Sequence, residues 1–286
     1  MNVNKKVTPG KMVIYAVLIL WAATTIYPIF WIVINSFKAK NEIIANSFAL
    51  PFGELFTTAN YETAFERLNI FSAYRNSLLI SCSVALVVVF IAGLASFALV
   101  RYSFRMKKLV NAMIIAGMMF PVFSTIIPVF RMLNAAHLVN TDNLFLSLLS
   151  VALPQIAGNL SFAIVVLSGY IHSLPIELEE AAYLEGCSAF QIFFKVVMPL
   201  TKPSFATVAI FSFLWSYNDL FTQMFLLRQP NQRAITRLLN ELTSQEGTNY
   251  GLMASAVALV VIPVILVYII LQKHIIKGMT AGAVKG

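Results

Sequence analysis

The chain is 286 residues long, 59% hydrophobic and 11% charged, with a mean hydropathy of +0.81 and a net charge of +8. An ordinary soluble domain of this length needs more polar surface, so the composition indicates an integral membrane protein. The Lys and Arg residues form no stripe interleaved with aromatic residues, and no nucleic-acid partner is expected.

Apolar runs long enough to cross a bilayer follow one another along the chain. A spanning helix needs about 20 mainly apolar residues. Six segments meet that length: 13–34, 77–100, 109–130, 144–171, 204–227 and 252–271. Runs of this kind favour helices over the alternating strands of a β-barrel. We therefore predict an all-α membrane protein with six transmembrane helices in a lipid bilayer.

The distribution of Lys and Arg predicts how these helices are oriented. The short turn after the second run carries Arg101, Arg105, Lys107 and Lys108 and no acidic residue, whereas the segment after the first run also contains several glutamates. Short loops rich in Lys and Arg remain in the cytoplasm. Both termini and the segment 173–202 are therefore expected to be cytoplasmic. The first run lacks a small-residue cleavage site, so it is expected to remain as an uncleaved helix.

The segment 173–202 concentrates acidic residues between the fourth and fifth runs. Glu177, Glu179, Glu180 and Glu185 are four of the 12 acidic residues of the chain. We expect Ser173 to cap a helix in whose first turn the glutamates suit the positive pole of the helix dipole. Pro175 would lie in that first turn, and Gly186 would end the helix.

A second short helix is predicted directly after Gly186. Ser188 and Gln191 have the spacing of a capping box, and Pro199 is expected to stop the helix. Its apolar stripe would pack under the membrane helices and consists of Phe190, Phe193, Phe194 and Val197. Ala181 and Ala182 of the first helix would leave a shallow face for a partner. The predicted unit is a helix, a glycine corner and a second helix.

Several short motifs in and around this unit match one family of proteins. Glu180-Ala181-Ala182, then Gly186 after three further residues, then Val196-x-Met198-Pro199, resembles the cytoplasmic signature loop of ABC importer permeases. Further matches are Asn60-Tyr61, Arg75-Asn76-Ser77-Leu78, Ser173-Leu174-Pro175-Ile176-Glu177-Leu178-Glu179 and Trp215-Ser216-Tyr217-Asn218-Asp219. The end of the chain, 278–286, is similar to the tail of carbohydrate-uptake permeases of the maltose type, in particular their shorter six-helix partner.

The resemblance implies a type I ABC importer permease fold with three regions. Residues 1–71 would hold a cytoplasmic segment, the first transmembrane helix and an external loop, 72–273 the transmembrane core, and 274–286 a cytoplasmic tail. The loop would be a coupling helix that docks in a cleft of an ATPase. The residues implied in this coupling are Glu180, Ala181, Ala182, Glu185, Gly186 and Pro199, and in the tail Gly282 and Lys285 would contact the ATPase.

The same resemblance implies the partners. They are a second, non-identical permease subunit, two ATPase subunits, an extracytoplasmic sugar-binding protein and a carbohydrate cargo, in a bacterial or archaeal cytoplasmic membrane. The chain has no Gly-x-x-x-x-Gly-Lys-Ser/Thr phosphate loop. ATP and Mg²⁺ are therefore expected in the partner ATPases, and the chain is expected to be a transport subunit without enzymatic activity, metal or cofactor of its own.

The sequence leaves open the role of some polar residues, the cargo and the class of transporter. Asn218 and Asp219 are expected to line a sugar pathway, because an ionisable group near a membrane span indicates function, or Asp219 pairs with a cation such as Arg75. Asn111 and Asn159 are expected to hydrogen-bond between helices. The cargo could instead be a phosphorylated polyol or a peptide. An ion-coupled secondary carrier is the alternative class, although its spans would be expected to hold more acidic groups.

Overall fold

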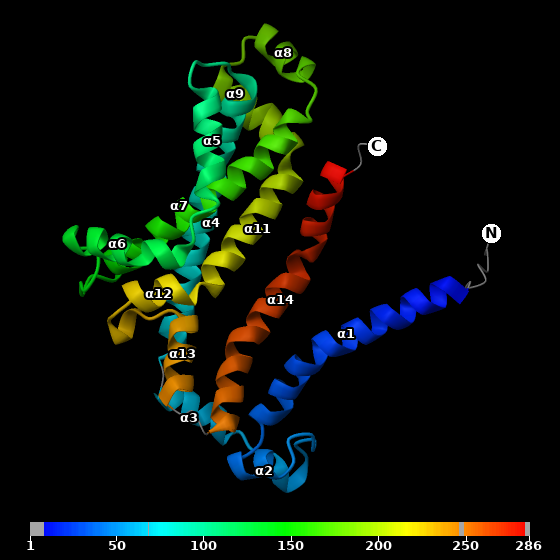
Figure 1. The fold of residues 1–286 in the computed structure, drawn as a ribbon, viewed down its shortest axis with the longest axis vertical. Helices are drawn as coiled ribbons and strands as arrows, with labels where there is room; N and C mark the ends of the chain where they lie inside the picture. Colours follow the sequence, from blue (N-terminus) through cyan, green and yellow to red (C-terminus); the bar gives the residue numbers. More distant parts are fainter. Residues whose placement is uncertain (1–8, 68, 246–248, 284–286) are drawn as a thin grey trace. The chain divides into compact units, whose positions relative to one another are not determined.

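A computed structural model describes residues 9–67, 69–245 and 249–283, and the regular elements among them are helices (Figure 1). Four of the described helices are long and apolar enough to cross a membrane: α1 (Pro9–Ser36), α4 (Ile70–Arg101), α7 (Leu144–His172) and the 250–269 part of α14 (Tyr250–Ala283). The pair Ala189–Leu200 and Lys202–Asn218, bent by 83°, is a fifth candidate. An all-α membrane protein is confirmed, and the count of six spans remains a prediction.

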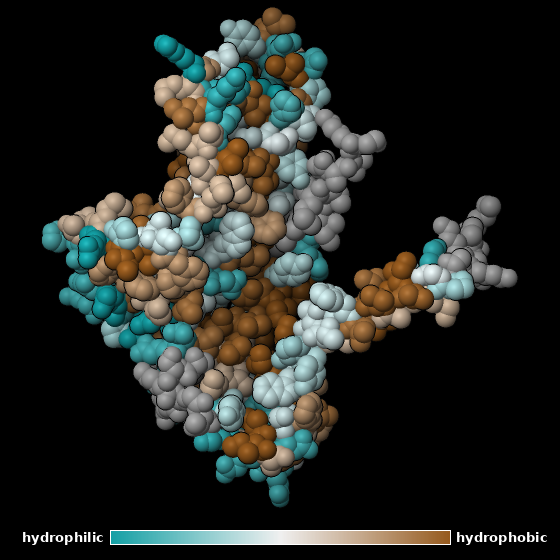
Figure 2. Space-filling view, viewed as in Figure 1, coloured by the Kyte–Doolittle hydropathy of each residue, from teal (hydrophilic) through white to brown (hydrophobic). Residues whose placement is uncertain are grey.

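The chain divides into two compact units, of which the first comprises residues 1–68 and 241–262. Its helices are α1, α2 (Lys40–Ala45), the 3-10 turn η1 (Gly53–Leu55), α3 (Ala59–Arg67), the 241–245 end of α13 (Ile235–Gln245) and the start of α14. Hydrophobic residues lie at the surface of α1 (Figure 2), among them Trp21 at 73% exposure. Exposed apolar side chains on a membrane-length helix suit contact with lipid or another subunit.

A buried lysine organises the turn that follows α1. Lys38 is fully buried, and its Nζ donates hydrogen bonds to the carbonyl oxygens of Asn46 (2.8 Å) and Ala49 (2.9 Å). Asn60 of α3 donates from Nδ2 to the carbonyl oxygens of Ser36 and Lys38, both at 2.9 Å. Desolvation lowers the pKa of Lys38, an effect that the nearby Glu42 carboxylate partly offsets. These bonds satisfy the backbone where the chain leaves α1.

The second unit comprises residues 69–240 and 263–286 and is built on three long helices. They are α4 (Ile70–Arg101), α7 (Leu144–His172) and α11 (Lys202–Asn218), which run together in Figure 1. The remaining elements are α5 (Lys107–Gly117), α6 (Val122–Ala135), α8 (Glu177–Leu184), α9 (Ala189–Ile192), a π-helical turn η2 (Phe193–Val197), α10 (Met198–Leu200), α12 (Leu220–Leu226), η3 (Pro230–Gln232), the 235–240 part of α13 and the end of α14.

Close packing joins the three long helices. Val84, Val88 and Ala92 of α4 are fully buried in one apolar core with Leu167 of α7. A Cβ atom on Gly93 would lie 2.7 Å from the Phe205 ring of α11, so glycine is required for this approach. The core holds the three helices in fixed register and provides the frame for the sites described below.

Two of the predicted spans are interrupted in the structure. The run 109–130 is not one helix, because α5 ends at Gly117 and α6 begins after Pro121. Proline lacks the N–H that would continue a helix and disfavours helical backbone at the residue before it. The run 204–227 is also divided, because α11 ends at Asn218 and the Asp219 carboxylate caps α12 by accepting from the Thr222 N–H at 3.0 Å.

Candidate functional site

The corner between α7 and α8 differs from the sequence-based prediction at its first residue. Ser173 does not cap α8; it follows the end of α7, where its Oγ donates to the Tyr170 carbonyl at 2.8 Å. Helix α8 begins at Glu177, and its N-cap Ile176 provides no side-chain hydrogen bond. The acidic residues Glu177, Glu179 and Glu180 do lie in its first turn, as predicted. Their negative charge interacts favourably with the positive end of the helix dipole, at a helix start that has no capping side chain.

An arginine at the end of α4 holds α8 in place. Arg101 donates from Nε to the Glu179 carboxylate at 2.7 Å, and from Nη2 to the carbonyls of Ile171 (2.9 Å) and Leu174 (3.1 Å). The two charged side chains are only 11% and 10% exposed. We call this set of contacts the arginine latch. The sequence-based interpretation used Arg101 only as a sign of topology and missed the pair, since 78 residues separate its partners.

The side of α8 that remains exposed combines charge and apolar surface. Glu180, Ala181 and Glu185 are exposed, whereas Ala182 is partly buried against the core. The predicted shallow face of two alanines is therefore split between the outside and the core. Leu184 is 87% exposed, and Figure 2 shows hydrophobic and hydrophilic residues side by side at the end of the second unit where α8 lies. Such a mixed, protruding surface suits a protein partner.

The glycine corner and the capping box of α9 form as predicted. Gly186 has a φ of +83°, a backbone conformation that residues with a Cβ rarely adopt. The backbone N–H of Cys187 returns to the Ala182 carbonyl at 3.0 Å, which closes the end of α8. Ser188 and Gln191 exchange reciprocal side-chain to backbone hydrogen bonds. These local signals decide where the chain turns.

The second helix of the unit continues further than predicted. Phe193 and Val197 are buried, but Phe190 is 66% exposed, so only part of the predicted stripe packs inward. Pro199 does not stop the helix; it lies inside α10, directly after the π-helical turn η2. In the wider turn the Met198 N–H donates to the Phe193 carbonyl, and Pro199 has no N–H that needs an acceptor.

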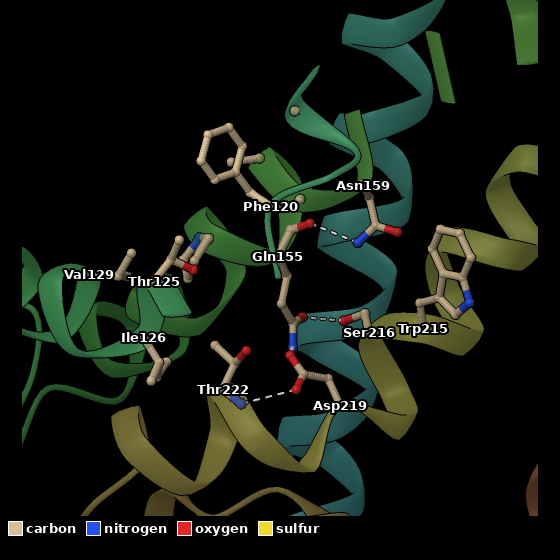
Figure 3. Close-up of a pocket in the computed structure, with 14 residues that line it drawn as sticks. Phe120, Thr125, Ile126, Val129, Gln155, Asn159, Trp215, Ser216, Asp219 and Thr222 are labelled. Carbon is tan, nitrogen blue, oxygen red and sulfur yellow. Dashed lines mark hydrogen bonds between the residues drawn. The ribbon is translucent and has the colours of Figure 1, made fainter. Parts of the chain in front are cut away.

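A pocket of about 480 Å³ lies between α7, α11, α12 and the break between α5 and α6 (Figure 3). We call it the α7–α11 pocket. Its lining residues are Gly117, Phe120, Thr125, Ile126, Val129, Pro154, Gln155, Ala157, Gly158, Asn159, Trp215, Ser216, Asp219 and Thr222. The two helix breaks described above border this pocket, and the second break contributes Asp219 and Thr222 to its lining.

A hydrogen-bonded chain of side chains crosses the wall of the pocket. Asp219 accepts from Gln155 Nε2 at 2.8 Å, and Gln155 Oε1 in turn accepts from the Ser216 hydroxyl at 2.5 Å (Figure 3). In the described part of the chain Asp219 therefore pairs with Gln155 and the Thr222 N–H, and not with Arg75, whose guanidinium donates to Asn76. Asn218 does not line the pocket, because it is exposed and its Nδ2 donates to Leu214 of its own helix at 2.9 Å.

The sequence missed most of the polar residues of this pocket. Asn159 does not bond between helices as expected; its Nδ2 donates within α7 to the Gln155 carbonyl at 2.7 Å, and its Oδ1 is buried without a partner among the described residues. Trp215 is 48% exposed and packs on Phe162, with ring centroids 4.9 Å apart. Trp215 and Asp219 are four residues apart, and this spacing could have predicted from sequence that they lie on one face of a helix.

Two further expectations concern metal ligands and the tail. Among the described residues no three His, Cys, Asp or Glu side chains are placed to hold a metal ion. Gly282 belongs to helix α14, and Lys285 lies outside the described residues.

Comparisons with known proteins identify the family. The family described as "Binding-protein-dependent transport system inner membrane component" matches residues 89–281. Among curated relatives, the diacetylchitobiose uptake system permease protein NgcG of Streptomyces coelicolor is 31% identical and aligns over 94% of this chain and 87% of its own length. The melibiose/raffinose/stachyose import permease protein MelC of Bacillus subtilis is 29% identical over 91% of each chain.

A solved structure supports the fold. The crystal structure of a bacterial ABC transporter involved in the import of the acidic polysaccharide alginate contains a chain that is 24% identical to this one, with a TM-score of 0.73 over 92% of this chain and 95% of the other. The helical arrangement is thus that of an ABC importer permease. This chain belongs to the family of inner membrane components of binding-protein-dependent transport systems, and it is a transport subunit and not an enzyme.

Proposed function

We propose that this chain is the permease subunit of an ATP-driven importer that moves a carbohydrate, most simply an oligosaccharide, across the cytoplasmic membrane by alternating access. The cargo would arrive on an extracytoplasmic binding protein. The names of the relatives NgcG and MelC, which concern diacetylchitobiose and melibiose, raffinose and stachyose, support a carbohydrate over a peptide or a phosphorylated polyol. Membership of a binding-protein-dependent family speaks against an ion-coupled secondary carrier.

The assembly would contain a second, non-identical permease subunit and two ATPase subunits, which would bind ATP and Mg²⁺. In this arrangement the chain would have six spans, with residues 1–71, 72–273 and 274–286 as its three regions and both termini in the cytoplasm. The interrupted segments, α5 with α6 and α11 with α12, would complete the count inside the assembly. Broken helices at membrane depth are tolerated where protein or a water-filled cavity surrounds them.

Coupling to the ATPase would run through α8 and the glycine corner. The observation that carries this proposal is the arginine latch, because it ties α8 to the ends of α4 and α7 while Glu180 and Leu184 remain free to meet a partner. Coupling requires an element whose position both sites influence. Ala181, Ala182, Glu185, Gly186 and Pro199 would complete the docking unit, and Gly282 and Lys285 of the tail would approach the ATPase.

One substitution tests the docking surface. Glu180 is exposed, so Glu180→Lys should leave membrane insertion intact. It should abolish transport by placing a cation where a basic group of the ATPase is expected. Copurification of the ATPase and uptake of radiolabelled sugar in membrane vesicles are the measurements, with Lys195→Glu, an exposed site outside α8, as the charge-reversal control. Wild-type uptake by the Glu180→Lys protein would refute the assignment.

The cargo is tested with the purified complex. ATPase activity should rise when the binding protein is added together with a neutral oligosaccharide from a panel of diacetylchitobiose, raffinose and arabinooligosaccharides. A complex that copurifies with an ATPase but responds to none of these, while responding to a peptide or a phosphorylated polyol, would refute carbohydrate import and retain the importer.

A further inference from the structure

We propose that the α7–α11 pocket is a cargo-binding site in this subunit, which takes an uncharged, hydroxyl-rich sugar ring and discriminates against acidic saccharides. The inference rests on the proposed function, since it assumes a carbohydrate cargo. Beyond the proposed function, it identifies where this subunit would contact the cargo, and it predicts that the cargo is uncharged. A volume of about 480 Å³ lies within the range of small-ligand sites.

The pocket wall offers hydrogen-bond acceptors that the protein leaves unused. Each oxygen of Asp219 accepts one N–H, from Gln155 Nε2 at 2.8 Å and from the Thr222 backbone at 3.0 Å, whereas a carboxylate has about four acceptor positions. Asn159 is 8% exposed, and its Oδ1 has no partner among the described residues. A buried acceptor without a donor is unfavourable and points to a missing group. Hydroxyl groups are the donors that would satisfy both residues.

An aromatic ring lies beside these acceptors. Trp215 precedes Asp219 by one turn of helix, and its ring is held by Phe162 (centroids 4.9 Å apart) and Phe211 (6.2 Å). About half of its surface, 48%, nevertheless remains exposed. Figure 3 shows the oxygen of Asn159 on the side facing Trp215. A sugar ring presents apolar C–H groups on its faces and hydroxyls on its edge, so a fixed indole next to free acceptors matches both parts.

The charge of the lining selects between neutral and acidic sugars. Among the described residues that line the pocket, Asp219 is the only charged one. Its two oxygens already accept the N–H groups of Gln155 and Thr222. A uronate carboxylate entering here would meet a like charge with no cation to pair with, which is unfavourable in a partly desolvated site. The α7–α11 pocket should therefore reject the acidic type of polysaccharide that the structurally similar alginate importer is named for.

A glycine in α7 allows the pocket to be filled without disturbing its polar network. A Cβ atom on Gly158 would meet nothing within 4 Å, and the residue lines the pocket. Gly158→Leu should fold, since replacing an unstrained helical glycine tends to stabilise a helix, and its side chain should occupy the site. Gly169→Leu is the matched control, because Gly169 lies on the same helix, also has open space at Cβ, and does not line the pocket.

The experiment measures equilibrium binding of neutral oligosaccharides (diacetylchitobiose, raffinose and arabinooligosaccharides) and of an alginate pentasaccharide to the purified full complex, without binding protein, by titration calorimetry. Gly158→Leu should weaken binding of the neutral probe by at least about tenfold, the equivalent of losing one good contact, and Gly169→Leu should match wild type. Asp219→Asn keeps an oxygen for the Thr222 cap but loses the charge. It should weaken the neutral probe and raise the relative affinity for the alginate pentasaccharide.

The outcomes separate this inference from the proposed function. If a neutral sugar binds and stimulates ATP hydrolysis, yet binds equally well to the wild-type, Gly158→Leu and Asp219→Asn complexes, the pocket inference is overturned and carbohydrate import stands. Preference of the wild-type complex for the alginate pentasaccharide would overturn the charge argument. If no sugar on the panel binds the complex or stimulates its ATPase, carbohydrate import itself fails and the pocket inference falls with it.

Discussion

The arginine latch makes the strongest prediction about stability and coupling. Replacing Arg101 by Met removes one charge-assisted bond to Glu179 and two bonds to the carbonyls of Ile171 and Leu174. It also leaves a carboxylate with a 10%-exposed side chain without its cation. Removing one partner of a buried pair costs about 3 to 5 kcal/mol. We take about 3 kcal/mol here, because α8 is at the end of the unit and water can reach the freed groups.

That cost should appear as local opening of α8. At 1.4 kcal/mol per factor of ten, about 3 kcal/mol corresponds to roughly a hundredfold larger open population of the helix. Hydrogen exchange of the amides in 177–184, followed by mass spectrometry on the purified complex, measures this directly. The exchange rate should rise by about two orders of magnitude in Arg101→Met. ATPase stimulation by the binding protein should fall in parallel.

Two further variants define what would refute the reasoning. Arg105→Met removes the same charge from an exposed position four residues later and should leave α8 exchange unchanged. In the double variant Arg101→Met with Glu179→Leu, no uncompensated charge remains, so part of the protection should return. If the amides of α8 in Arg101→Met exchange as slowly as in wild type, the latch does not hold the helix. If the double variant exchanges faster than Arg101→Met, buried charge is not the cause.

Two other substitutions test single backbone and side-chain requirements. Gly186→Val places a β-branched residue at a φ of +83° and should destabilise the corner by about 1–3 kcal/mol. Copurification of the ATPase should therefore drop, whereas Gly169→Val, on an open helix surface, is the control. Copurification of the ATPase with Gly186→Val at the wild-type level would argue against the corner. Lys38→Met leaves the carbonyls of Asn46 and Ala49 unpaired and should cost about 1–3 kcal/mol. Its signature would be faster limited proteolysis of 40–56 compared with exposed Lys40→Met, and equal cleavage of the two variants would contradict the role given to Lys38.

Local sequence signals determined the parts of the structure in which neighbours along the chain are also neighbours in space. The apolar runs identified the membrane class because their length and hydropathy reflect the solvent around each helix. Gly186 and the Ser188–Gln191 capping box placed the corner, since turn and cap chemistry is decided within four residues. The same local reasoning erred at Ser173 and Pro199, where Ile176 begins the turn into α8 and a π-helical turn absorbs the proline.

Tertiary structure alone decided the contacts that give these elements a function. Arg101 reaches Glu179 across 78 residues, and Gln155 reaches Asp219 across 64. A sequence pattern of helical or strand period relates residues only a few positions apart, so it detects neither pair. In the described part of the chain, the unpartnered oxygen of Asn159 and the exposed face of Trp215 meet at a pocket that α7, α11 and the breaks at Pro121 and Asp219 form together. Burial, pairing and free volume depend on residues distant in sequence, and for that physical reason they follow from the fold and not from the order of residues.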